Sequence, residues 1–163
     1  MKNMMVVAAV AAIAIFQTRG DTYTVNAGDT QTLDSVTNTT RFTKSGAGTL
    51  VVTGTNSLTT LTSSGGTLKG NVTVTDKLVF DAAQPPSAGL TVNGSLTLGS
   101  GVTVEIANTN LLTRGAAYTL ATLPTPFPST PASNLTKPWC VFLTNGGKTL
   151  KMHYEAGTMF LIK

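Results

Sequence analysis

The sequence predicts an all-β protein, a short parallel β-helix-like solenoid with about 18 residues in each turn. The set Gly48-Thr49-Leu50 recurs eighteen residues later as Gly66-Thr67-Leu68. Short triplets, most of them apolar–Thr–apolar, also recur at steps of six, and three such steps make eighteen. These triplets are Val72-Thr73-Val74, Leu78-Val79-Phe80, Leu90-Thr91-Val92, Leu96-Thr97-Leu98 and Val102-Thr103-Val104. A turn with three short faces satisfies both spacings, with apolar side chains inside and threonines outside. A two-sheet β-sandwich, which also uses short alternating strands, is the alternative.

The first 20 residues resemble a secretory signal. Lys2 is followed by an uncharged apolar run from Met4 to Phe16, which is too short for a membrane span of about 20 residues. We expect cleavage just before Asp21, with an earlier site after Ala14 as the alternative. A buried helix or an uncleaved anchor is the competing interpretation of this segment.

The rest of the chain divides into three parts by composition. Residues 21–123 hold the predicted solenoid, with a loop at Gln84-Pro85-Pro86-Ser87 and one helical turn within 106–115. Residues 124–138 are rich in proline, which cannot donate to a β ladder, and so predict an exposed loop.

The last part, residues 139–163, predicts an antiparallel cap of three strands. The breaks fall at Asn145-Gly146-Gly147 and at Glu155-Ala156-Gly157, and Asn-Gly is a strong hairpin signal. On the middle strand, Leu150, Met152 and Tyr154 share one face, which we expect to cover the last turn. Lys151, His153 and Glu155 share the other.

Part of the chain resembles the autotransporter-associated β-strand repeat. The likeness is carried by Tyr23–Gly28, by Thr43–Gly54 with its Lys-x-Gly-x-Gly-Thr-Leu-x-Val pattern, and by Gly65–Leu68. It covers about residues 23 to 70 and is weaker to residue 104. The ending, Leu111–Gly115 through Gly146–Lys151, is similar to the C-terminal end of such repeat proteins. The resemblance implies a passenger-type β-helix on the surface of a Gram-negative bacterium. No segment has the pattern of membrane strands about 10 residues long, so we expect no translocator barrel within these residues.

Charge and cysteine content exclude several classes. The formal net charge is +4, and removal of Lys2 and Arg19 with the signal leaves +2, too little to indicate a nucleic-acid partner. Cys140 is the single cysteine, so no internal disulfide can form.

The candidate site residues do not form a recognisable catalytic or metal-binding pattern. The acidic residues are spaced singly: Asp21, Asp29, Asp34, Asp76, Asp81, Glu105 and Glu155. Asp76 and Asp81 could meet in space, but solvated strand edges are the simpler expectation. A Cys140–His153 pair is conceivable in the cap, although Cys140 follows Trp139 in an apolar strand and is expected to be a buried, inert thiol. We therefore predict no catalytic, cofactor or metal residues.

These observations predict a non-catalytic, adhesin-like structural module that is exported to the outer cell surface or beyond, with the periplasm as an alternative location. The expected partners are surface glycans, host or neighbouring-cell surfaces, or other copies of the chain, with no nucleic acid and no membrane once the signal is removed. A carbohydrate-binding or carbohydrate-active β-helix is the main alternative. An ice-binding solenoid is a remote one, suggested by Thr-x-Thr pairs such as Thr22/Thr24 and Thr73/Thr75.

Overall fold

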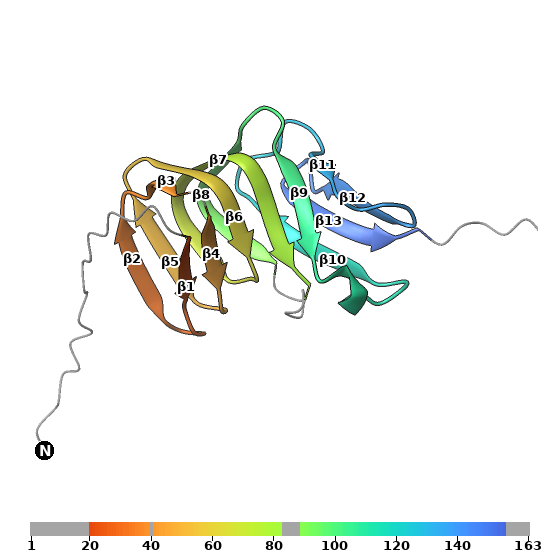
Figure 1. Ribbon diagram of the computed structural model, residues 1–163, viewed down its shortest axis with the longest axis horizontal. Helices are drawn as coiled ribbons and strands as arrows, with labels where there is room; N and C mark the ends of the chain where they lie inside the picture. Colours follow the sequence, from red (N-terminus) through yellow and green to blue (C-terminus); the bar gives the residue numbers. More distant parts are fainter. Residues whose placement is uncertain (1–19, 40, 83–88, 156–163) are drawn as a thin grey trace, which may run out of the picture.

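The computed structural model describes residues 20–39, 41–82 and 89–155, and over these residues the protein is all-β (Figure 1). The predicted signal segment up to residue 19, the loop at 84–87 and the third cap strand lie outside the described residues. The described strands join into one mixed sheet of 13 strands. They are β1 (Asp21–Thr24), β2 (Thr30–Asp34), β3 (Thr37–Thr39), β4 (Phe42–Ser45), β5 (Thr49–Thr53), β6 (Asn56–Ser63), β7 (Thr67–Asp81), β8 (Leu90–Leu98), β9 (Thr103–Ala107), β10 (Ala117–Thr122), β11 (Ala132–Ser133), β12 (Trp139–Thr144) and β13 (Thr149–Tyr154).

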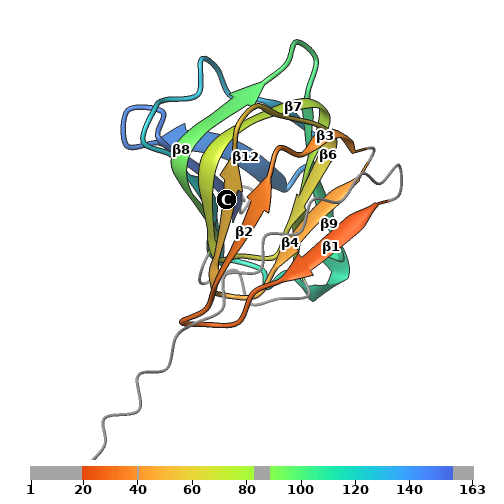
Figure 2. The same cartoon turned by 90° about the vertical axis from the view of Figure 1, so that its left-hand side faces the viewer.

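Up to β11, the strands pair in three parallel rows. The first row runs β1, β4, the end of β6, the end of β7, β9 and β11. The second runs β2, β5, the start of β7, the start of β8 and β10. The third runs β3, the start of β6, the middle of β7 and the end of β8. Figure 2 looks along the stack and shows these strands running around a common core.

The repeat interval is less regular than the sequence predicts. Thr49 lies opposite Thr67, eighteen residues later, which confirms the pairing of the two Gly-Thr-Leu sets. Thr67, however, lies opposite Thr91, twenty-four residues later. The longer interval includes residues 83–88, outside the described part of the chain, so the extra residues fall between β7 and β8.

The core consists of apolar side chains stacked along the rows. Phe42, Leu61, Leu78 and Val104 follow one another in the first row, and each is at most 1% exposed. Leu50, Leu68 and Val92 form a similar stack in the second row. Full burial of such a side chain contributes about 1.5–3 kcal/mol, so these stacks stabilise successive strands in register. The predicted alternation of inward apolar and outward threonine side chains is confirmed in the triplets at 72–74 and 90–92.

The connecting segments match the predictions in part. A single 3₁₀ turn, Thr109–Leu111, falls within the predicted helical segment. The proline-rich segment is mostly exposed, but it also contributes β11 to the first row and buries Phe127. Proline excludes a ladder bond only at its own position, so Ala132 and Ser133 remain free to pair. Among the described residues, no helix has the length and hydrophobicity to cross a membrane.

The described part of the chain ends in an antiparallel hairpin. β12 and β13 pair around a turn in which Asn145, Gly146 and Gly147 all have positive φ, as the Asn-Gly signal predicts. The other edge of β13 is paired with β10, so β13 lies between two strands. Leu150 and Met152 are fully buried, as expected, whereas Tyr154 is half-buried.

Candidate functional site

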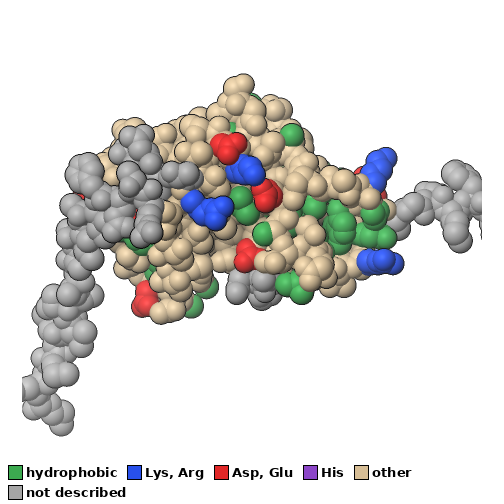
Figure 3. Space-filling model, viewed as in Figure 1, with side chains coloured by type: hydrophobic (Ala, Val, Ile, Leu, Met, Phe, Trp, Pro, Cys, Tyr) green, Lys and Arg blue, Asp and Glu red, His purple; other side chains and the backbone are tan. Residues whose placement is uncertain are grey.

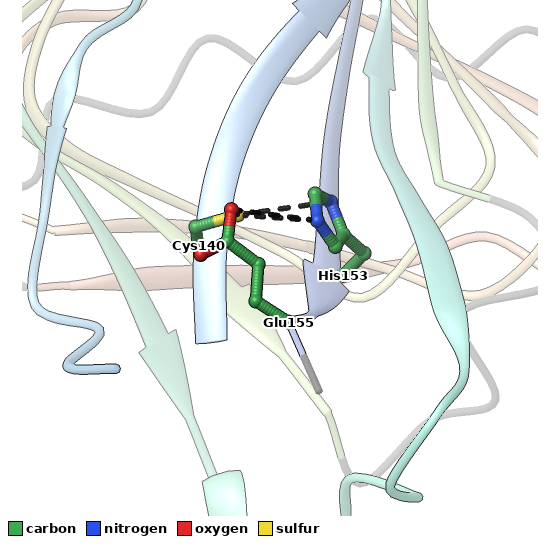
Figure 4. A group of neighbouring side chains, drawn as sticks. All are labelled: Cys140, His153 and Glu155. Atoms are coloured by element: carbon green, nitrogen blue, oxygen red, sulfur yellow. Dashed lines mark hydrogen bonds and ion pairs between the residues drawn. The ribbon is translucent and has the colours of Figure 1, made fainter. Parts of the chain in front are cut away.

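The β12–β13 hairpin brings three polar side chains together on its outward face. Cys140 lies directly opposite His153 in the antiparallel register, and Glu155 follows His153 by two residues, so all three project from the same side of the hairpin (Figure 4). Their potential ligand atoms all lie within 4.8 Å of one another, close enough to hold a metal ion. Among the described residues, no other group of three or more His, Cys, Asp or Glu side chains converges in this way.

The contacts within the group are short. The Sγ atom of Cys140 lies 3.5 Å from Nε2 and 3.6 Å from Nδ1 of His153. The same thiol donates a hydrogen bond to Oε1 of Glu155 at 3.4 Å. Nε2 of His153 lies 3.7 Å from that carboxylate oxygen. Each of the three side chains therefore contacts the other two.

The placement of Cys140 corrects one expectation. The thiol is half-buried on the outward face and does not lie in the core. The reason is strand alternation, because Val141 and Leu143 pack against the core and leave Cys140 and Phe142 on the opposite side. The Phe142 ring packs edge-on against the His153 imidazole, with centroids 4.6 Å apart, and limits how the imidazole can turn.

The electrostatics of the thiol do not favour nucleophilic catalysis. Burial raises the pKa of Cys140, and the hydrogen bond to Glu155 and the charge of its carboxylate raise that pKa further. A catalytic cysteine needs the opposite shift, toward the thiolate. Without a cation, the group is therefore a protonated thiol held between an imidazole and a carboxylate.

The remaining acidic candidates have other roles. Asp34 accepts a hydrogen bond from Thr53 at 2.7 Å, and Asp81 accepts one from Asn108 at 2.6 Å. Glu105 forms a surface ion pair with Lys77 at 3.1 Å. These contacts join neighbouring strands or turns, and Asp76 is exposed on β7.

A buried lysine, which the sequence analysis did not single out, lies at the other end of the molecule. Lys44 is 0% exposed, and its Nζ donates to the carbonyl oxygens of Gly46 at 2.6 Å, Ser45 at 3.0 Å and Gly65 at 3.2 Å. Burial lowers the pKa of Lys44. Gly46 follows β4 and Gly65 follows β6, so the ammonium group joins the ends of two neighbouring strands of the first row. The Lys-x-Gly-x-Gly pattern was the signal in the sequence that could have identified it.

A second buried polar group joins neighbouring strands in the same way. Asn56 is 2% exposed, accepts a hydrogen bond from the Val36 amide at 2.7 Å, and donates to the carbonyls of Thr53, Gly54 and Asn71 at 3.0–3.2 Å. Its amide therefore satisfies backbone groups at or beside three successive strands of the second row, β2, β5 and β7.

Comparisons with protein-family models, with curated proteins and with solved structures found no match.

Proposed function

We propose that this chain is a non-catalytic β-solenoid module of an exported protein, which acts as a structural and adhesive element at or beyond the outer cell surface. The observation that carries the proposal is the stacking of three parallel rows in register over a continuous apolar core. Such a stack makes an extended, rigid body from short repeats, and each added turn lengthens the body without a new fold.

The character of the surface supports this proposal. Figure 3 shows a face made mainly of backbone and of side chains that are neither charged nor hydrophobic, with scattered charges and with hydrophobic side chains gathered toward the β12–β13 end. The second row presents a line of threonines across five strands, Thr30, Thr49, Thr67, Thr91 and Thr122. A broad, weakly charged surface of this kind suits contact with glycans, other cell surfaces or further copies of the chain.

The resemblance to the autotransporter-associated repeat supports export. The residues that carry it, from Tyr23 to Leu68, coincide with β1 to the start of β7, where the stacking is most regular. Lys44, the lysine of the repeat pattern, joins two turns of this stack. The segment before Asp21, with its single lysine and apolar run, has the composition of a secretory signal.

Carbohydrate recognition is the second candidate, and one observation favours it. Three half-buried aromatic rings meet at the hairpin end, with Trp139 5.4 Å from Tyr154 and 6.0 Å from Tyr118 between centroids. Aromatic faces are suited to stacking against sugars. These rings also pack on one another, and Tyr118 accepts a hydrogen bond from the Thr113 amide through its hydroxyl, so much of their surface serves the fold.

The ice-binding alternative is less well supported. A second line of side chains runs beside the threonine line of the second row, two residues further along each strand. It consists of Thr32, Val51, Lys69 and Asn93. Only the first residue of this second line is a threonine, so the row does not present two parallel threonine lines.

Two experiments test the proposal. The gene expressed with its own start in a Gram-negative host should yield exported protein whose intact mass corresponds to a start near Asp21, and full-length protein retained in the cytoplasm would contradict export. Beads coated with residues 21–163 should capture cells or bind a glycan array without releasing sugars from polysaccharides. Turnover of any polysaccharide would overturn the non-catalytic assignment.

A further inference from the structure

The group formed by Cys140, His153 and Glu155 has the dimensions of three corners of a metal-coordination tetrahedron. Ligands bound to zinc at 2.0–2.3 Å in tetrahedral geometry lie about 3.3–3.8 Å from one another. The three separations here are 3.5 Å for sulfur to Nε2, 3.4 Å for sulfur to Oε1 and 3.7 Å for Nε2 to Oε1. All three fall within that range, so an ion could be coordinated without backbone movement.

We propose that Cys140, His153 and the Glu155 carboxylate form a three-ligand binding site for Zn²⁺ on the outward face of the hairpin. The ligand types favour a borderline-soft transition metal, because thiolate and imidazole are typical zinc ligands. Calcium and magnesium prefer shells made wholly of oxygen, which this group cannot supply. Zinc takes the place of the thiol proton, which is released to solvent, and the thiol–carboxylate hydrogen bond is replaced by two bonds to the metal.

The scaffold holds these ligands in place. Two of them lie on a directly opposed pair of an antiparallel ladder, and the strand that carries His153 is paired on both edges. The Phe142 ring against the imidazole restricts its rotation. The imidazole presents both nitrogens at almost equal distances from sulfur, so either nitrogen can bind the ion after a small reorientation of the ring.

The fourth coordination position faces outward. Cys140 and His153 are half-buried and Glu155 is exposed, so water or a donor atom from a bound partner can complete the tetrahedron. The site is independent of the proposed structural function, since it lies on the hairpin and not on the stacked rows.

The test uses untagged protein purified in the presence of a chelator and then freed of it. Titration calorimetry with Zn²⁺ alone should give one site per chain. Titration with Co²⁺ should give the thiolate-to-cobalt charge-transfer band and the strong visible bands of a tetrahedral ion. Addition of Zn²⁺ to the cobalt-loaded protein should remove the charge-transfer band and the visible bands. Zn²⁺ should also protect Cys140 from alkylation.

The variants separate a built site from a reactive thiol. Cys140→Ser should abolish the charge-transfer band, and His153→Gln and Glu155→Gln should each weaken Zn²⁺ binding at least tenfold while circular dichroism stays unchanged. Lys151→Gln, on the same strand and face, should bind as the parent does. The proposal is overturned if no one-to-one binding occurs, or if both His153→Gln and Glu155→Gln bind zinc like the parent.

Discussion

At the scale of single residues, buried polar side chains hold neighbouring parallel strands in register. Lys44 carries a charge in a fully buried position, where burial is costly unless each proton finds an acceptor. Its three carbonyl partners provide that compensation. Because the partners lie at the ends of two neighbouring strands, β4 and β6, the lysine stabilises their register against a slipped one.

Replacement of Lys44 by methionine tests this role. Lys44→Met keeps the length of the side chain but leaves buried carbonyls without their donor, and should lower the free energy of unfolding by about 1–3 kcal/mol. The control is Lys77→Met, which removes an exposed lysine whose ion pair with Glu105 contributes at most about 1 kcal/mol. Urea unfolding of both variants measures the difference, and equal losses would contradict the role assigned to Lys44.

Gly94 lies where two strands approach too closely for any side chain to fit. It pairs with Gly70 across β7 and β8, and an added Cβ would collide with the Gly70 carbonyl oxygen. Gly101 also has a positive φ, of 84°, but an added Cβ there would meet nothing within 4 Å.

These two glycines form a matched pair for substitution. Gly94→Ala should destabilise the protein by about 3 kcal/mol or more, because strands that carry the core would have to separate. Gly101→Ala should cost about 1 kcal/mol, the strain of a left-handed alanine. Thermal unfolding compares them, and a Gly94→Ala variant as stable as Gly101→Ala would show that β7 and β8 are not in this register.

At the scale of elements, the β12–β13 hairpin has one face toward the apolar core and one face toward solvent. Its inner face adds Leu150 and Met152 to the core, and its outer face holds Cys140 and His153. The two faces of β13 could be predicted from alternation, whereas those of β12 could not, because its residues from Trp139 to Leu143 are all apolar in character. The Cys140–His153 pair could be suggested from the sequence but not assigned, because it depends on the four-residue turn at 145–148 that sets Thr144 opposite Thr149. A shift of one residue would place Cys140 on the inner face.

Glutamine substitutions on adjacent residues of β13 test the two faces. Met152→Gln puts an amide among apolar side chains and removes packed volume, at a cost of about 2–4 kcal/mol. Lys151→Gln places the same residue on the outer face and should change stability by no more than about 0.5 kcal/mol. If both substitutions have the same effect in denaturant titration, the assignment of the inner face is wrong.

At the scale of the whole molecule, the hairpin ends the parallel stack. β10 pairs with β8 on one side in parallel and with β13 on the other in antiparallel orientation. Removal of the hairpin would leave the β10 edge unpaired and uncover part of the core that includes Leu120. An unpaired edge of this kind invites association with other chains.

Truncation at Pro138 tests whether the hairpin acts as a cap. The shortened protein, residues 21–138, should form oligomers or fibres, whereas residues 21–163 should remain soluble. Size-exclusion chromatography with light scattering compares them. A truncated form that elutes as a folded monomer would mean that the stack does not need this hairpin.

The sequence was most informative about the fold where the same short motif recurs along the chain. The Gly-Thr-Leu spacing predicted the pairing of Thr49 with Thr67, because glycine bends and stacked leucines recur together. It did not give the length of the step to Thr91, although the loop predicted at 84–87 falls within that step. It also did not predict the strand at Ala132–Ser133, which depends on contacts between distant segments. The buried role of Lys44 was missed for the same reason, because a lysine is usually on the surface unless the fold supplies acceptors.

The most direct test of the account is the parallel pairing of successive turns in solution. In NMR spectra of the uniformly labelled protein, contacts between the Hα of one strand and the amide proton of the next should connect the regions around Gln31, Leu50, Leu68 and Val92 in series. The proposed solenoid requires this series. Close Hα–Hα contacts between neighbouring strands within residues 21–107, which antiparallel pairing in a sandwich would produce, would contradict it.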